Sequence, residues 1–131
     1  MRKDTKNWLD MAEYDLQTAE HMLETGRYVY VIFMCHLSIE KTLKGLVTEE
    51  TKKIPPKTHD LLYLTQKAAA QFAPEILDFV GMINNASIAT RYPRDFSRLI
   101  SSYPKEVASD YLKRTKEVVQ WLRQDPRLRE S

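Results

Sequence analysis

The stretch from Tyr28 to Val47 constrains the fold more than any other part of the chain. It opens with eight consecutive apolar residues, Tyr28 to Cys35, whose β-branched and aromatic types would suit a buried strand if taken alone. Beyond this run, apolar residues recur at intervals of three and four, which is the spacing of a helix. We therefore predict one long central helix whose N-terminal half is enclosed by neighbouring helices.

Two polar side chains interrupt the apolar stripe of this predicted helix. At about 100° per residue, Leu43 and Val47 flank His36 at about 20° on either side, and Glu40 lies about 40° away. An imidazole and a carboxylate thus project from an apolar face, where buried polar groups need partners other than water. His36 could bond Glu40 within its own helix. A satisfied core histidine is one interpretation of His36, and a functional histidine is the alternative.

The composition favours one helical domain and excludes several classes of protein. A chain of 131 residues is long enough for a single domain, 1–131, with its own core. Charged residues make up 29% and apolar residues 43%, which is typical of a globular helical protein. The formal charge of +2, from 20 basic and 18 acidic side chains, gives no general electrostatic footprint for nucleic acid or membrane.

Cysteine usage and hydropathy indicate a compartment. The single cysteine, Cys35, cannot form an internal disulfide and lies in the most apolar part of the chain, so we expect a small core residue in a reducing environment. The first ten residues contain no apolar segment of signal-peptide length. The apolar run at Tyr28 is also far shorter than the roughly 20 residues that span a bilayer. We expect a cytoplasmic protein without a membrane partner.

The remaining chain divides into amphipathic segments separated by turn residues. Apolar spacing predicts helices over residues 4–25, 60–72, 74–91 and 104–122, the second of them short. In the helix from Pro74, either Ile88 or Thr90 faces inward. Residues 91–104 lack a period and indicate a loop with a short turn around 96–100. We therefore predict an all-α fold, an antiparallel up-and-down four-helix bundle with an additional short helix.

Taken in order, several short motifs in these segments resemble the HEPN domain, a small helical domain linked to nucleotide binding. The resemblance extends over roughly residues 8–122. The residues that carry it are Ala12, Asp15-Leu16 and Ala19, Gly26-Arg27-Tyr28, the run from Ser38 to Lys44, Pro55 or Pro56 followed by Thr58-His59-Asp60-Leu61, and Ala89-Thr90-Arg91-Tyr92-Pro93.

The resemblance implies a bundle that forms a homodimer, often encoded beside a minimal nucleotidyltransferase with which it makes a complex of toxin and antitoxin type. The apolar surplus of the central helix is the sequence argument for a dimer. Many HEPN domains are also metal-independent ribonucleases, which carry an arginine followed four to six residues later by a histidine. Here no histidine follows Arg91, because the three histidines are His21, His36 and His59. The Arg-Tyr-Pro segment is more similar to non-nucleolytic, partner-binding members.

Six residues are candidates for a nucleotide-binding site. In the functional interpretation, Glu40 lines a polar pocket together with Asp15 and His59, while Lys44 binds an anion. In the alternative, Glu40 and Lys44 form a surface salt bridge of about half a kcal/mol, since they stand four residues apart. Asp15 lies at the edge of its helix's apolar stripe, where a carboxylate is half shielded. The full set of candidates is Arg91, Glu40, Lys44, His59, Asp15 and His36.

Two of these candidates lie at helix ends. His59 precedes a predicted helix whose backbone donors suit phosphate, and its alternative role is to cap the helix or fix the loop. Arg91 is the candidate most readily assigned a function, with an ion pair to Asp95 or a helix C-terminal role as the alternatives.

Around Arg91, four neighbours form a small basic and aromatic patch: Tyr92, Arg94, Phe96 and Arg98. It could stack on and neutralise a nucleotide or single-stranded RNA, or form the rim of a site for a protein partner.

Other chemistries lack the residues they require. Di-iron bundles need two Glu-x-x-His pairs, no glycine-rich phosphate loop is present, and a thiolate at Cys35 is disfavoured by its apolar surroundings. We expect no catalytic residue, no metal and no cofactor. The leading hypothesis is a non-catalytic HEPN domain that homodimerises and binds nucleotide or a minimal nucleotidyltransferase. The alternatives are a ribonuclease using Arg91 with His36 or His59, and a purely structural helical scaffold.

Overall fold

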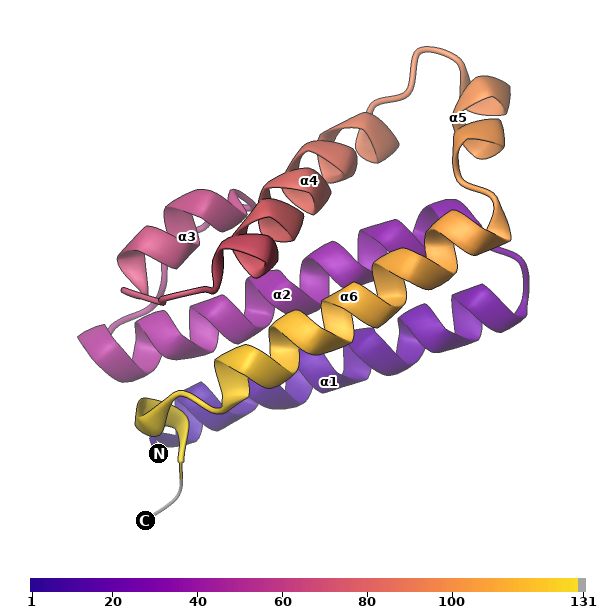
Figure 1. Ribbon diagram of the computed structural model, residues 1–131. Helices are drawn as coiled ribbons and strands as arrows, with labels where there is room; N and C mark the ends of the chain where they lie inside the picture. Colours follow the sequence, from indigo (N-terminus) through magenta and orange to yellow (C-terminus); the bar gives the residue numbers. More distant parts are fainter. Residues whose placement is uncertain (130–131) are drawn as a thin grey trace.

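A computed structural model of the protein describes residues 1–129, and these residues form helices without any strand (Figure 1). The prediction of an all-α fold is confirmed. The helices are α1 (Lys3–Glu24), α2 (Tyr28–Thr51), α3 (Leu61–Lys67), α4 (Pro74–Arg91), α5 (Phe96–Ser102) and α6 (Lys105–Arg123), followed by the short 3-10 helix η1 (Pro126–Leu128).

The four long helices run alternately in opposite directions, which is the predicted up-and-down bundle (Figure 1). α1 and α2 lie side by side along their lengths, α6 packs on both, and α4 lies on the other side of α2 together with α3. Every other helix of the described chain contacts α2. The central position that the apolar run predicted for this segment is therefore confirmed.

The core forms around α2 because its apolar side chains point in every direction. Ile32, Ile39 and Leu43 are fully buried, and each contributes about 1.5–3 kcal/mol by leaving water. Gly45 permits a close approach of α1, since a Cβ at this position would lie 3.1 Å from a methyl carbon of Leu9. Cys35 is buried as predicted, and burial raises the pKa of its thiol to about 12.

Two predicted details of the helices were wrong. α3 ends at Lys67 instead of residue 72, because Ala69 adopts a left-handed conformation with a φ of 49°. The expected turn at 96–100 is a helix, α5, which begins where the Asp95 carboxylate accepts a hydrogen bond from the backbone of Arg98 at 3.1 Å. The alternative left open in α4 is settled, because Thr90 faces inward and Ile88 is 62% exposed.

No helix within residues 1–129 is long and apolar enough to cross a membrane.

Candidate functional site

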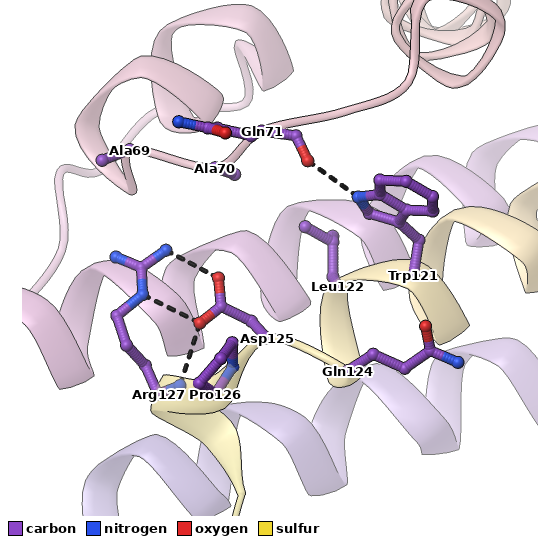
Figure 2. Close-up of a pocket in the computed structure, with 9 residues that line it drawn as sticks. All are labelled: Ala69, Ala70, Gln71, Trp121, Leu122, Gln124, Asp125, Pro126 and Arg127. Atoms are coloured by element: carbon purple, nitrogen blue, oxygen red, sulfur yellow. Dashed lines mark hydrogen bonds and ion pairs between the residues drawn. The ribbon is translucent and has the colours of Figure 1, made fainter.

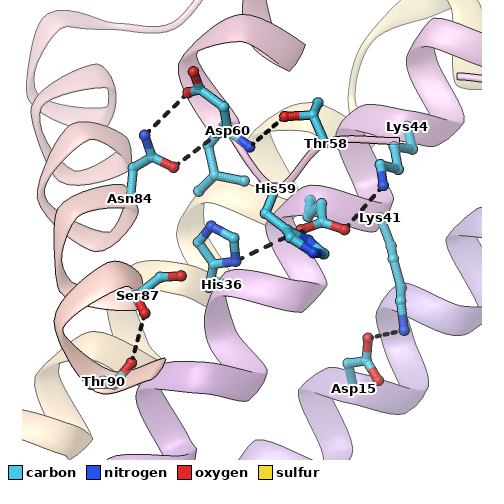
Figure 3. A network of polar contacts seen from close by, with 12 residues as sticks. Asp15, His36, Lys41, Lys44, Thr58, His59, Asp60, Asn84, Ser87 and Thr90 are labelled. Atoms are coloured by element: carbon cyan, nitrogen blue, oxygen red, sulfur yellow. Dashed lines mark hydrogen bonds and ion pairs between the residues drawn. The ribbon is translucent and has the colours of Figure 1, made fainter. Parts of the chain in front are cut away.

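A cleft of about 350 Å³ lies between α2, the loop that precedes α3 and the C-terminal half of α4. Figure 3 shows several of its polar side chains together with the ion pairs nearby. The lining residues are His36 from α2, Thr58, His59 and Asp60 from the loop, and Asn84, Ser87, Ile88, Arg91 and Tyr92 from α4 and its end.

Glu40 lies behind the cleft wall, where its carboxylate binds two basic side chains. Its carboxylate is 3% exposed and has a cationic partner at one oxygen, with Lys44 Nζ 3.1 Å from Oε2. The other oxygen, Oε1, lies 2.8 Å from Nδ1 of His59. Lys44 is itself buried and lies over the ring of Trp8, 5.6 Å from its centroid. The interpretation of Glu40 and Lys44 as a surface salt bridge is therefore wrong, because both side chains are buried.

His59 is held in one orientation by this carboxylate. Since a carboxylate accepts and does not donate, Nδ1 of His59 carries the proton in the hydrogen bond to Glu40. The opposite nitrogen, Nε2, is then left for a ligand or solvent, and the side chain is 63% exposed. A carboxylate that fixes the tautomer of a histidine in this way is a common arrangement in binding and catalytic sites.

The loop that carries His59 is pinned to α4. Asp60 caps α3, accepting two backbone hydrogen bonds from its first turn at 3.1 and 3.3 Å. The same carboxylate oxygen accepts from the amide nitrogen of Asn84 at 3.2 Å, while the amide oxygen of Asn84 accepts from the backbone of Leu61 at 3.0 Å. The start of α3 and the middle of α4 are therefore joined directly, with His59 beside them.

His36 forms the buried floor of the cleft and is 1% exposed. Its Nδ1 lies 3.8 Å from Oε1 of Glu40 and has no hydrogen-bond partner. The expected hydrogen bond between these two side chains is thus not formed. Burial lowers the pKa of His36 to about 4; the charge of Glu40 opposes this shift and the charge of Arg91 adds to it. His36 is therefore neutral at pH 7.

Arg91 lies in the last turn of α4 with donors that nothing in the described chain uses. Its guanidinium stacks on Phe33, with Cζ 4.5 Å from the ring centroid. Nε and Nη2 are buried and lack a hydrogen-bond partner, and Arg91 forms no ion pair within residues 1–129. The expected ion pair with Asp95 is absent, since that carboxylate caps α5. Nε and Nη2 form the edge of the guanidinium that binds carboxylate or phosphate oxygens in a bidentate manner.

The other predicted candidates lie apart from the cleft floor. Asp15 is paired with Lys41 at 2.6 Å and lies to one side (Figure 3). Tyr92 lines the cleft and is 80% exposed. Arg94 and Arg98 are exposed and do not line the cleft, and Phe96 lines a separate, mainly apolar pocket of about 90 Å³.

Two cleft residues, Asn84 and Ser87, were missed by the sequence analysis. A usable signal exists, because Asn84, Ser87 and Arg91 are spaced by three and four residues and so share one side of α4. Polar side chains at that spacing within an otherwise apolar helix indicate a side of the helix that faces solvent or a cleft.

A second cavity, of about 430 Å³, lies between the end of α3 and the C-terminal segment (Figure 2). Its one guanidinium, Arg127, uses all three nitrogens. Nε and Nη2 bond the Asp125 carboxylate at 3.0 and 2.9 Å, and Nη1 bonds the carbonyl of Ala68 at 2.6 Å and Glu50 at 3.1 Å. Trp121 donates to the carbonyl of Gln71 at 2.8 Å. These contacts clamp the C-terminal segment to α3 and leave no charged donor for a ligand.

Within residues 1–129, no three His, Cys, Asp or Glu side chains gather in a group that could hold a metal ion.

Comparisons with known proteins agree with this architecture. The family model of the HEPN domain matches residues 5–125. The structure is similar to the crystal structure of TT1696 from Thermus thermophilus, with a TM-score of 0.78 at 18% identity over 94% of this chain and 98% of that one. It is also similar to ST0689, described as an archaeal HEPN homologue, with a TM-score of 0.72 at 20% identity over 94% and 97% of the two chains. No match to a curated protein was significant.

Proposed function

This chain belongs to the HEPN domain family, and from that premise we propose that it is a non-catalytic member that binds a nucleotide in the cleft between α2 and α4. We further propose that it forms a homodimer and associates with a minimal nucleotidyltransferase in a complex of toxin and antitoxin type.

The unused donors of Arg91 carry the proposal of a nucleotide site. A buried donor without a partner costs about 1–3 kcal/mol, so a ligand that supplies acceptors removes a penalty that the free protein bears. Nε and Nη2 of Arg91 are two such donors on one edge of the guanidinium, and they lie at the cleft that His59 also lines. Phosphate oxygens match this arrangement.

The rim of the cleft suits the nucleoside part of such a ligand. Tyr92 is 80% exposed and Ile88 is 62% exposed, and both line the cleft. A base stacked on an aromatic ring gains about 1–3 kcal/mol. A volume of about 350 Å³ also lies within the usual range for small-molecule sites.

The outer face of α4 supports the proposal of a homodimer. Leu77, Ile88 and Tyr92 fall within about 60° of one another around the helix, and all three are exposed. Exposed apolar side chains that share one side of a helix are typical of an association surface. The apolar residues of α2, which the sequence offered as the reason for a dimer, are buried inside the bundle. The exposed face of α4 is therefore the surface proposed for the dimer. Since Ile88 and Tyr92 also line the cleft, pairing through α4 would bring two clefts together.

Calorimetry with AMP tests the nucleotide site. We expect binding to the wild type and a dissociation constant at least about tenfold higher for Arg91→Gln, which loses the bidentate edge. Arg123→Gln, on the exposed last turn of α6, is the matched control and should bind as the wild type does. Size-exclusion chromatography with and without a minimal nucleotidyltransferase tests the assembly. A monomer that binds neither AMP nor the enzyme would overturn the proposal.

One observation favours a second candidate function, metal-independent cleavage of RNA. His36, His59 and Arg91 line the same cleft, although they are far apart in the sequence and no histidine follows Arg91. His59, oriented by Glu40, could transfer a proton, and Arg91 could stabilise the phosphorane charge. Incubation of RNA with the purified wild type and with His59→Ala and Arg91→Ala distinguishes the two functions. Cleavage that both variants lose supports the ribonuclease, and an inert wild type excludes it.

A further inference from the structure

Two basic side chains, Arg91 and His36, line the cleft between α2 and α4, and a charge on one disfavours a charge on the other. Arg91 is charged and has no ionic partner within residues 1–129, and its charge helps to keep the buried His36 neutral. The other ionisable groups around His36 are already engaged. On α2, Glu40 is paired with Lys44 and with His59 from the loop, and Asp60 is bound to the first turn of α3 and to Asn84.

The charge that this cleft can present is therefore variable. With His36 neutral, the unmatched positive charge is the single charge of Arg91. With His36 protonated, it is two charges on groups that line the same cleft. The Nδ1 of His36, which has no hydrogen-bond partner in the free protein, lies 3.8 Å from Glu40 and would have a carboxylate nearby in the protonated state.

Building on the proposed nucleotide site, we infer that the group bound beside Arg91 is a terminal phosphate monoester with two negative charges, and that His36 takes up a proton from solvent when it binds. A phosphodiester carries one negative charge, which Arg91 alone neutralises. A dianion is matched by a second positive charge. Of the two histidines that line the cleft, His36 is the one whose Nδ1 is buried without a hydrogen-bond partner, since Nδ1 of His59 is bonded to Glu40.

The coupling follows from the same charges that keep His36 neutral in the free protein. A bound dianion cancels the repulsion from Arg91 and adds an attraction of its own, and both effects favour the imidazolium. Between the pKa values of His36 in the free and bound states, proton uptake and ligand binding therefore strengthen each other. Affinity for the monoester falls as the pH rises through that window, while affinity for a diester changes little.

Proton uptake can be measured by titrating AMP into the full chain at pH 7 in several buffers that differ in ionisation enthalpy. At this pH the phosphate of AMP is mostly a dianion, since its second pKa is about 6. Cyclic AMP serves as the diester with one negative charge. Inorganic phosphate serves as the phosphate group without a nucleoside. We expect uptake approaching about one proton per AMP and cyclic AMP binding about tenfold weaker with little uptake.

Two variants assign the proton to a residue. His36→Gln keeps a polar side chain of similar reach and should abolish the uptake, whereas His21→Gln, exposed at the end of α1, should leave it unchanged. Should His36→Gln fail to fold, nitrogen NMR of the wild type labelled in its three histidines gives the same answer. The ring nitrogens of His36 should change from the neutral to the cationic pattern on saturation with AMP.

The outcomes separate this inference from the proposed function. Equal binding of AMP and cyclic AMP without proton uptake would overturn the inference and leave the nucleotide site intact. Absence of binding by AMP, cyclic AMP and phosphate alike would overturn both. Inorganic phosphate that binds with the same proton uptake as AMP would support the charge chemistry and show that the nucleoside adds no affinity.

Discussion

At the scale of single residues, the candidate site depends on one buried carboxylate. Glu40 is tolerable in the core because Lys44 and His59 each occupy one of its oxygens. A buried ion pair of this kind adds little net stability compared with apolar residues, but removing one partner leaves the other charge buried and uncompensated. Glu40 is thus a positioning residue for His59. We expect its substitution to lower the stability of the folded protein.

We expect Glu40→Gln to lower the free energy of unfolding by about 3 kcal/mol, because Lys44 would stay buried without a counter-charge. Lys44→Met in the same background should restore most of this loss, since the methionine stem fills the space over Trp8. Urea denaturation of the single and double variants measures both effects. Asp10→Asn, which breaks the exposed pair of Asp10 with Lys6, is the control and should be neutral. Equal stability of wild type and Glu40→Gln would contradict this prediction.

The lowered pKa of His36 predicts how the free energy of unfolding changes with pH. Between about 6.5 and about 4 the unfolded chain binds a proton at His36 that the folded chain does not, so the free energy of unfolding falls as the pH falls. From pH 7 to pH 5 this one residue should cost about 2 kcal/mol. Urea denaturation at the two pH values should therefore show a flatter dependence for His36→Gln than for the wild type. The same slope in both proteins would show that His36 is not buried as a neutral imidazole.

Periodicity explains which of these residues could be predicted from the sequence. His36 and Glu40 stand out because they interrupt an apolar stripe, and a stripe is a property of one helix. The residues that contact them from other parts of the chain cannot be predicted from the spacing of apolar residues. His59 reaches Glu40 from 19 residues away through a loop, and Arg91 reaches Phe33 across two helices. Pairings of this kind are set by how helices pack, which a single sequence does not encode locally.

At the scale of helices, α3 is the element that positions the loop of the site. It has seven residues, two of them buried, so it is held mainly by its ends. The Asp60 cap and the two hydrogen bonds of Asn84 fix its start to α4. Its early end at Lys67 and the existence of α5 both depend on caps and on one left-handed residue, features that apolar spacing does not reveal.

We expect Asn84→Ala to loosen the start of α3 and to destabilise the protein by about 1–2 kcal/mol, because the Leu61 backbone donor and the Asp60 carboxylate each lose a partner. Hydrogen exchange should show faster exchange for residues 61–64 with α1 and α6 unaffected. Asp95→Ala, which removes the corresponding cap of α5, is the control and should leave α3 protected. Unchanged protection of α3 in Asn84→Ala would contradict the prediction.

At the scale of the whole molecule, the bundle leaves α4 with one face against α2 and α3 and another in solvent. The exposed side chains Leu77, Ile88 and Tyr92 lie along that outer face, and Ile88 and Tyr92 also line the cleft. The bundle topology was predictable because four long helices, one of them apolar almost all round, can pack together in few ways. Which face of α4 stays open was not predictable, because Ile88 and Thr90 were both candidates to face inward and only the packing shows that Ile88 is exposed.

We expect the wild type to sediment as a dimer and Ile88→Asp to sediment as a monomer, since a carboxylate on the outer face of α4 would be buried in the interface. Analytical ultracentrifugation at several protein concentrations measures both. Ile54→Asp is the matched control, because Ile54 is 86% exposed on the loop after α2, away from this face. Dimers of Ile88→Asp as tight as those of the wild type would exclude α4 as the interface.

The central claim is that the unpartnered guanidinium of Arg91 receives the anionic group of a nucleotide. An NMR titration of nitrogen-labelled protein with AMP tests it most directly, because the Nε–H group of Arg91 has no acceptor in the free protein and would gain one. We expect a large shift of that signal, accompanied by amide shifts confined to residues 58–60 and 84–92. An Arg91 signal that stays unchanged while AMP saturates the protein, or shifts that gather around the second cavity near Arg127, would contradict it.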